Sequence, residues 1–328
     1  MQYKALVVEE SDEKYFSSVK TLNTDNLPSG DVLVHVRYSS LNYKDALSAT
    51  GNKGVTKKYP HTPGIDAAGV VTESASELFR VGDEVIVTGY DLGMNTPGGF
   101  GEYIRVPAHW VIKLPEGLTL KEAMIIGTAG FTAGISMIRL TELVKPDDGK
   151  IIVSGATGGV GSMALSMLSK AGYSTVAISG KSQELDFIKA LGTSEIISRT
   201  DFQNTDNKPI LSSQYAGAID TVGGEILVRI IKSLNPLGAV TTCGSVAGTK
   251  LELSVFPFIL RGISLIGVSA QNYPGNLRKM LWERLASEMK PVNLLDIYHE
   301  ITLNELPDAI NQILSGKLKG RTIVRISE

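Results

Sequence analysis

The segment that most constrains the fold is residues 150–172, KIIVSGATGGVGSMALSMLSKAG. An apolar run, a cluster of glycines and a helix-forming stretch follow one another there. In such a strand–turn–helix unit, glycines let the backbone approach a pyrophosphate and let the helix pack against the strand. The N–H groups and the dipole at the helix N-terminus then favour an anion. The segment predicts a dinucleotide site whose pyrophosphate is contacted by Thr157, Gly158, Gly159, Val160 and Gly161.

The chain around this segment alternates between short apolar runs and helix-forming stretches. Strands are expected at 150–155, 174–179, 194–198, 215–222, 238–243 and 263–268. Helices are expected between them at about 159–171, 182–190, 224–234 and 276–289. Alternation at this spacing produces βαβ units and a parallel sheet. Six strands match a doubly wound nucleotide-binding fold.

The first 120 residues follow a different pattern. Short runs rich in Val and Ile are separated by the turn signals PSG, TPG, VGD and PGG, which predicts a small β-barrel or sandwich. The end of the chain returns to short elements and finishes in the strand-like RTIVRIS. We therefore expect two domains, with 1–120 and 295–328 forming one and 121–294 forming an inserted nucleotide-binding domain.

Composition excludes several classes of protein. The chain has 328 residues, 43% of them apolar and 20% charged, and a net charge of −2, so nothing points to nucleic acid or a membrane surface. The single cysteine, Cys243, excludes an intrachain disulfide framework and a multi-cysteine metal site. The beginning of the chain becomes charged too early for a secretory signal, and no apolar run was expected to reach the roughly 18 residues of a membrane span. These features predict a cytoplasmic protein.

The end of the second expected strand indicates which dinucleotide binds. A carboxylate about 20 residues after the last glycine grips the ribose hydroxyls of NAD. Here Ser179, Gly180 and Lys181 stand at that place, and Arg199 follows the next strand. Hydroxyl, backbone N–H and cationic groups suit a 2′-phosphate, which arginine holds through a planar fork. The pattern predicts NADP(H), the alternative being that Lys181 and Arg199 are ordinary surface cations.

The whole chain resembles the medium-chain dehydrogenase/reductases, and within them the zinc-free branch. The resemblance rests on SSLNYKDALSATG, YPHTPGIDAAGVV, AMIIGTAGFTA, SGATGGVGSMA, AISGK, GAIDTVGG and FPFILRGISLIGV. It is greatest to the acrylyl-CoA reductases, which are often named quinone oxidoreductases. The resemblance implies a GroES-like β-rich catalytic domain, a Rossmann domain and a homodimer formed around residues 250–270. The apolar strand ISLIGV at the sheet edge is compatible with such pairing.

The zinc ligands of related enzymes are missing from the sequence. Zinc-dependent relatives carry a Cys near the start of the substrate loop and a Gly-His-Glu in the next turn. Here the corresponding segments read SSLNYKD and PGIDAAG, with Ile65 and Asp66 in place of His-Glu. A hydride-transfer zinc site needs three protein ligands, and no such set is visible. We therefore expect no metal.

The catalytic candidates lie in LNYKDAL. Asn42 is a possible hydrogen-bond donor, Tyr43 a donor or acid, and Asp45 an orienting carboxylate. Such groups would stabilise charge on a carbonyl oxygen and supply a proton after hydride transfer, although water is an alternative proton donor. The competing interpretation is that these residues only cap a short helix.

The resemblance implies further contacts. It places Tyr43 against the nicotinamide end of the cofactor. It also places Val222, Gly244, Ser245, Ile259 and Ala270 near the cofactor. Ala270 would contribute only its backbone groups.

The sequence leaves more than one substrate open as the acceptor of the hydride. Lys53, Lys57 and Lys58 lie on one expected loop and would steer the phosphates of an enoyl-CoA, unless the loop is simply solvated. A quinone would need more aromatic surface than this region has. The alternatives left open are an NADPH:quinone oxidoreductase and a non-catalytic NADPH-binding protein.

Overall fold

The computed structural model describes residues 1–203 and 208–327, which fall into two compact units. Unit 1 consists of residues 1–128, 271–287 and 294–328, and unit 2 of residues 129–270 and 288–293. The predicted domain ranges differ from these units in two respects. The first boundary lies eight residues later than 120, and the segment 271–287 belongs to unit 1 rather than to the nucleotide-binding unit.

Buried contacts explain why the segment 271–287 joins unit 1. Arg278 is 2% exposed and donates to the Thr88 carbonyl at 2.8 Å and to the Gln271 carbonyl at 3.0 Å. Its guanidinium lies 4.6 Å from the ring centroid of Tyr90. The expected helix 276–289 is present as Gly275–Leu285, and its buried face combines Arg278 with the apolar side chains of Leu281, Trp282 and Leu285.

Unit 1 is β-rich. Within the described residues, its main sheet has the strand order β14-β15-β3-β4-β5-β7, with β6 also paired to β3, while β1 and β2 form a separate hairpin. The elements are β1 (Gln2–Ser11), β2 (Lys14–Asn23), β3 (Val32–Leu41), α1 (Tyr43–Ala49), β4 (Asp66–Ser74), β5 (Glu84–Thr88), β6 (Tyr103–Val106), β7 (Val111–Lys113), α8 (Gly275–Leu285), β14 (Tyr298–Thr302), α9 (Leu306–Leu314) and β15 (Arg321–Arg325). The C-terminal strand β15 pairs with β3, with Thr322 opposite Leu41, so the tail rejoins the first segment as expected.

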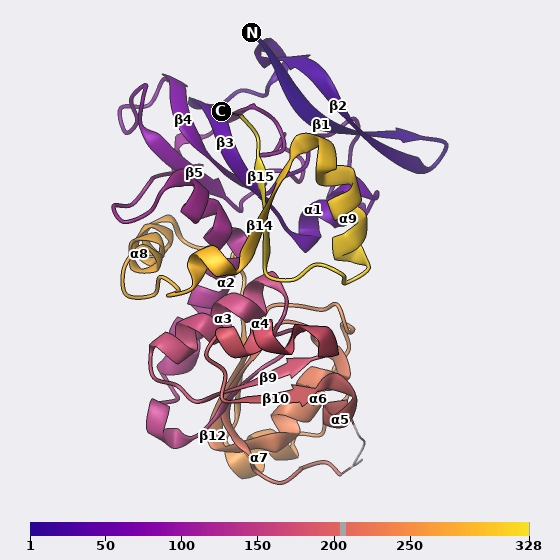
Figure 1. Ribbon diagram of the computed structural model, residues 1–328, viewed down its shortest axis with the longest axis vertical. Helices are drawn as coiled ribbons and strands as arrows, with labels where there is room; N and C mark the ends of the chain where they lie inside the picture. Colours follow the sequence, from indigo (N-terminus) through magenta and orange to yellow (C-terminus); the bar gives the residue numbers. More distant parts are fainter. Residues whose placement is uncertain (204–207, 328) are drawn as a thin grey trace. The chain divides into compact units, whose positions relative to one another are not determined.

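Unit 2 is a doubly wound α/β fold (Figure 1). Its described strands form a parallel sheet in the order β10-β9-β8-β11-β12-β13. The elements are β8 (Ile151–Val153), α3 (Gly159–Lys170), β9 (Thr175–Ser179), α4 (Leu185–Ala190), β10 (Glu195–Ser198), α5 (Arg199–Gln203), β11 (Tyr215–Asp220), α6 (Gly224–Ser233), β12 (Leu234–Thr242), α7 (Phe256–Arg261) and β13 (Ser264–Gly267). This order brings the carboxyl ends of β8, β9 and β11 together at the edge where ligands bind in such sheets.

Helix α2 (Leu120–Thr141) is long and apolar enough to cross a membrane by length and composition. This corrects the expectation that no stretch has that length. The helix is not straight, however, because Gly127 adopts a non-helical conformation with φ 49°. In the structure 83% of its most apolar window is buried, so burial inside the protein accounts for its apolar composition.

Candidate active site and cofactor site

The start of α1 is fixed by a buried carboxylate. Asp45, in the first turn, is fully buried. Its Oδ2 accepts the N–H of Asn42 and its Oδ1 accepts the N–H of Ile65, both at 2.8 Å. The carboxylate thus caps the helix and ties it to the turn before β4. Burial and the neighbouring charge of Asp66 raise the pKa of Asp45 to about 7, although the bonds from Asn42 and Ile65 oppose the shift.

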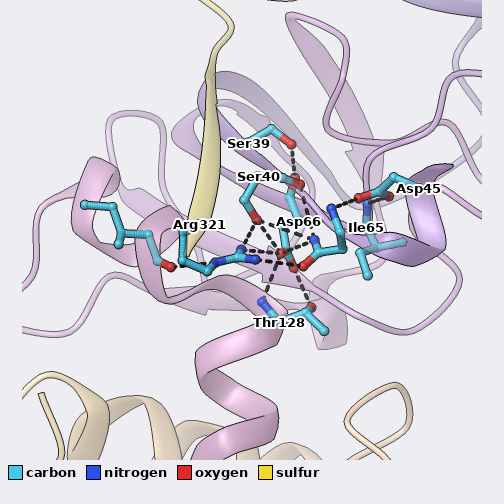
Figure 2. A network of polar contacts seen from close by, with 9 residues as sticks. Ser39, Ser40, Asp45, Ile65, Asp66, Thr128 and Arg321 are labelled. Atoms are coloured by element: carbon cyan, nitrogen blue, oxygen red, sulfur yellow. Dashed lines mark hydrogen bonds and ion pairs between the residues drawn. The ribbon is translucent and has the colours of Figure 1, made fainter. Parts of the chain in front are cut away.

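A second carboxylate collects donors from three segments (Figure 2). Asp66 is 0% exposed and opens β4. It accepts the Ser40 hydroxyl at 2.6 Å and the Asn42 amide at 2.8 Å. Thr128 adds its hydroxyl at 2.5 Å and its backbone N–H at 2.9 Å. The side chain of Asp66 therefore joins β3, the cap of α1 and the middle of α2.

Arg321 completes this cluster from the C-terminal strand. Its guanidinium is 3% exposed and lies 4.0 Å from the Asp66 carboxylate. It donates to the Ile125 carbonyl and to the Ser40 hydroxyl, both at 2.8 Å, and to the Asn42 side-chain oxygen at 3.3 Å. Burial lowers the pKa of Arg321, against the attraction of the nearby carboxylates. We call Ser40, Asn42, Asp66, Thr128 and Arg321 the arginine hub.

Gly127 is required at this place for two reasons. Its φ of 49° is unfavourable for side-chain-bearing residues. A Cβ there would also lie 2.7 Å from both Arg321 Nη2 and Asp66 Oδ2. The glycine in IIGTAG thus breaks α2 and lets Thr128 point its donors at Asp66.

The structure gives the three catalytic candidates different surroundings. Tyr43 is 40% exposed, and within the described parts of the chain its hydroxyl has no hydrogen-bond partner. Asn42 is only 9% exposed, and both ends of its amide are engaged in the arginine hub. Asp45 is engaged by backbone groups, as the capping interpretation requires. Tyr43 is therefore the candidate whose polar group remains available to a substrate.

The three lysines predicted to steer phosphates have different surroundings. Lys53 forms an ion pair with Glu10 at 2.8 Å and lies 4.8 Å from the ring centroid of Tyr59. This partner makes Lys53 a poor candidate for phosphate steering, whereas Lys57 and Lys58 are exposed. Sequence reasoning missed Lys44, which follows Tyr43 and donates to the Gln271 side chain at 2.9 Å. Burial lowers the pKa of Lys44.

The glycine loop of unit 2 fits a pyrophosphate. Helix α3 begins at Gly159 after Gly158, which provides no side-chain cap, and its first turn has no acidic residue. A Cβ on Gly161 would strike the Gly155 carbonyl, so the close passage of helix and turn requires glycine there. At Gly158 the nearest atom to a Cβ would be 3.3 Å away, which leaves the backbone approachable. Thr157 and Val160 lie next to these glycines, and their contact with the cofactor stays a prediction.

The predicted ribose-reading residues come together through sheet register. Ser179 pairs with Ser198 across β9 and β10, so Gly180 and Arg199 follow at adjacent strand ends. The Arg199 guanidinium covers Gly180 so closely that a Cβ there would lie 2.9 Å from its Cζ. The Ser179 hydroxyl accepts the N–H of Lys181 at 3.0 Å. An exposed guanidinium over a glycine at this edge suits a phosphate on the ribose.

The remaining predicted contacts are spread more widely. Val222 and Gly244 lie in the loops after β11 and β12, and a Cβ on Gly244 would strike the Thr221 carbonyl. Ser245 follows in the same loop. Ile259 lies on α7 and is 67% exposed, and Ala270 is the last residue of its segment of unit 2. The structure thus groups Val222, Gly244 and Ser245 at the sheet edge, but gives no geometric reason for a role of Ile259.

Comparison with known proteins decides the family. Residues 28–116 match the family described as Alcohol dehydrogenase GroES-like domain, and residues 159–287 match the one described as Zinc-binding dehydrogenase. YhfP of Bacillus subtilis, provisionally named a quinone oxidoreductase, is 43% identical over 99% of both chains. The protein belongs to the medium-chain dehydrogenase/reductase superfamily.

Other members of the superfamily support the same assignment. The acrylyl-CoA reductase AcuI of Ruegeria pomeroyi is 38% identical over 99% of both chains. The crystal structure of the YhdH oxidoreductase from Salmonella enterica in complex with NADP is 41% identical, covers 100% of both chains and has a TM-score of 0.96. The structure of YhfP with NAD bound is 42% identical, covers 99% of both chains and also has a TM-score of 0.96. The predicted family and two-domain α/β fold are confirmed.

The turn that holds zinc in related enzymes has a different set of side chains here. Among residues 1–203 and 208–327, no three His, Cys, Asp or Glu side chains are grouped so that they could hold a metal ion. Asp66, which the resemblance aligns with the glutamate of zinc-dependent relatives, is held by Arg321 and neutral donors. Arg321 was not among the predicted site residues, and an arginine in RTIVRIS, which also contains Arg325, gives no local signal for this role.

Proposed function

We propose that the protein is an NADPH-dependent, zinc-independent reductase that adds hydride to the carbon–carbon double bond of an α,β-unsaturated acyl thioester such as acrylyl-CoA. Full-length likeness to AcuI supports the reaction class, and the surroundings of Arg199 support the cofactor. A cytoplasmic location, expected from the sequence, is part of the same proposal. The competing activity is quinone reduction, which the name of YhfP favours.

The observation that carries the proposal is the guanidinium of Arg199, the first residue of α5, placed over Gly180. When bound, NADPH supplies the hydride. Arg199 and the donors around Ser179 would hold the 2′-phosphate, and the first turn of α3 would hold the pyrophosphate. The exposed Tyr43 hydroxyl would donate to the carbonyl oxygen of the acceptor, where negative charge develops. The arginine hub, through Asn42, and the capping carboxylate of Asp45 hold the helix that carries Tyr43.

Measurements of cofactor affinity test the proposed preference for NADPH. We expect Arg199→Ala to weaken NADPH binding by about 1.5–3 kcal/mol, because a charge-assisted contact is lost, and to leave NADH binding nearly unchanged. Arg139→Ala is the matched control, because Arg139 is an exposed arginine whose ion pair with Glu142, at 3.7 Å, is also exposed. Fluorescence titration of both nucleotides measures the effect. Equal affinities of the native protein for NADH and NADPH would overturn the cofactor choice.

The acceptor is tested by following NADPH oxidation with acrylyl-CoA, crotonyl-CoA and a quinone. We expect the two thioesters to be reduced faster than the quinone, and dialysis against a chelator to leave the rate unchanged. Tyr43→Phe should lower kcat more than it changes KM, because the lost bond strengthens in the transition state. Oxidation with none of the acceptors would favour a non-catalytic NADPH-binding protein.

A homodimer remains part of the proposal. In the described sheet of unit 2, β13 is an edge strand whose Leu265 and Ile266 are only partly buried. Ile259 and Leu260 on the preceding α7 are 67% and 66% exposed. An apolar edge of this kind pairs readily with a second copy. We expect a dimer by sedimentation at micromolar concentration, and Ile266→Lys should separate it. A monomeric native protein would contradict the proposal.

A further inference from the structure

A buried carboxylate in unit 2 lies outside the mechanism described so far. Asp220 is the last residue of β11 and is 0% exposed. Its carboxylate accepts the hydroxyls of Ser154 and Thr242 at 2.7 and 2.9 Å. It also accepts the N–H groups of Gly223 at 3.0 Å and Val222 at 3.3 Å. Among the described residues no Lys, Arg or His pairs with it, so neutral donors alone hold this charge.

These bonds connect the ends of three neighbouring strands. Ser154 directly follows β8, and its hydroxyl accepts the Thr221 N–H at 2.9 Å while its carbonyl accepts the Thr221 hydroxyl at 2.9 Å. The Asp220 carbonyl accepts the Cys243 N–H at 3.1 Å, just after β12. We call Ser154, Asp220, Thr221 and Thr242 the aspartate hub. It sets the start of each loop that carries predicted cofactor contacts after β8, β11 and β12.

Strand order indicates which half of a dinucleotide lies over this hub. The ribose-phosphate residues follow β9 and β10, and the pyrophosphate loop follows β8. The sheet continues from β8 to β11 and β12, away from β9. A dinucleotide lying across the carboxyl edge therefore directs its nicotinamide half toward β11 and β12.

We propose that Asp220 is a positioning residue for the nicotinamide half of the cofactor, and that its buried negative charge favours the oxidised ring over the reduced one. Loss of a hydride leaves a nicotinamide ring with a positive charge, whereas the reduced ring is neutral. A carboxylate away from water acts on such a charge more strongly than a solvated one. The inference rests on the proposed NADPH-dependent function.

The test compares the binding of NADP⁺ and NADPH rather than turnover. Asp220→Asn removes the charge and keeps the shape, and we expect the ratio of the NADP⁺ to the NADPH dissociation constant to rise on the order of tenfold. Thr242→Val is the matched control, because it removes one bond to the same carboxylate without changing the charge. In the control both dissociation constants should shift together. Titration of NADPH fluorescence, with NADP⁺ as competitor, gives both values.

The outcomes separate this inference from the proposed function. A native protein that binds neither nucleotide would overturn the proposed function. A native protein that binds both, with an Asp220→Asn ratio equal to that of Thr242→Val, would overturn only the role of Asp220. If the asparagine variant does not fold, Asp220→Ser supplies the uncharged protein. The native protein should also bind NADP⁺ at least as tightly as NADPH, and a tenfold preference for NADPH would overturn the inference without any variant.

Discussion

The arginine hub of unit 1 and the aspartate hub of unit 2 each stabilise a buried carboxylate, but they do so with different groups. Each holds a fully buried carboxylate: Asp66 is the first residue of β4, and Asp220 is the last residue of β11. Asp66 has a guanidinium 4.0 Å away, whereas Asp220 has only hydroxyl and backbone donors. The first cluster is close to electrically neutral and the second keeps a net negative charge. Burying a carboxylate therefore does not require a cation when several donors converge on it.

Removing the guanidinium should have the largest effect on stability. We expect Arg321→Met to lower the free energy of unfolding by about 3–5 kcal/mol, because Asp66 would stay buried without its counter-charge. Arg325→Met is a control in the same strand, since Arg325 forms a half-exposed pair with Glu300 at 3.0 Å and should cost at most about 1 kcal/mol. Denaturant unfolding measures both. Equal losses would mean that the arginine hub has no special energetic role.

Neutralising Asp220 should cost less. Asp220→Asn leaves no charge unpaired. It does, however, place the N–H groups of an amide next to the Gly223 N–H and the Thr242 hydroxyl, which now donate to the carboxylate. We expect a loss of about 1–3 kcal/mol in unfolding free energy, the range for one poorly satisfied buried polar group. The same denaturant experiment applies. A loss as large as that of Arg321→Met would contradict the idea that the aspartate hub needs no cation.

The pH dependence of stability should report on Asp45, the buried carboxylate beside the arginine hub. The pKa of Asp45, beside the arginine hub, is raised to about 7, while the unfolded chain has the ordinary value of about 3.9. Between these values the folded state holds a proton that the unfolded chain has lost. The stability of native protein relative to Asp45→Asn should therefore fall as pH rises from about 4 to about 7, by roughly 1.4 kcal/mol per pH unit. A difference that is constant over this range would refute the shift.

Local signals predicted most of the elements of unit 2. The expected strands at 150–155 and 174–179 are observed as β8 and β9, and the helix expected at 224–234 is observed as α6. Each depends on residues adjacent in the chain, such as the apolar run before the glycine loop. The short helices α5 and α7 were missed because five or six residues give too little periodicity.

Unit 1 was predicted less completely, because its key contacts are far apart in the sequence. Asp66 and Asn42 could be singled out from PGIDAAG and LNYKDAL, yet nothing near Arg321 indicates that its side chain meets them. The contact follows from β15 pairing with β3, which sheet register decides. Likewise, the packing of α8 depends on Arg278, whose carbonyl partners have no sequence signature.

The interrupted course of unit 1 has a consequence for protein synthesis. Residues 129–270 of unit 2 emerge as one continuous piece, and most of that unit can fold while translation proceeds. The first 128 residues must wait, because β15 and its Arg321 are made only after unit 2. Until then Asp66 lacks its counter-charge and β3 lacks one neighbour. The nascent chain thus exposes an unpaired edge of β3 until residues 321–325 have been made, the period in which chaperones would have most to protect.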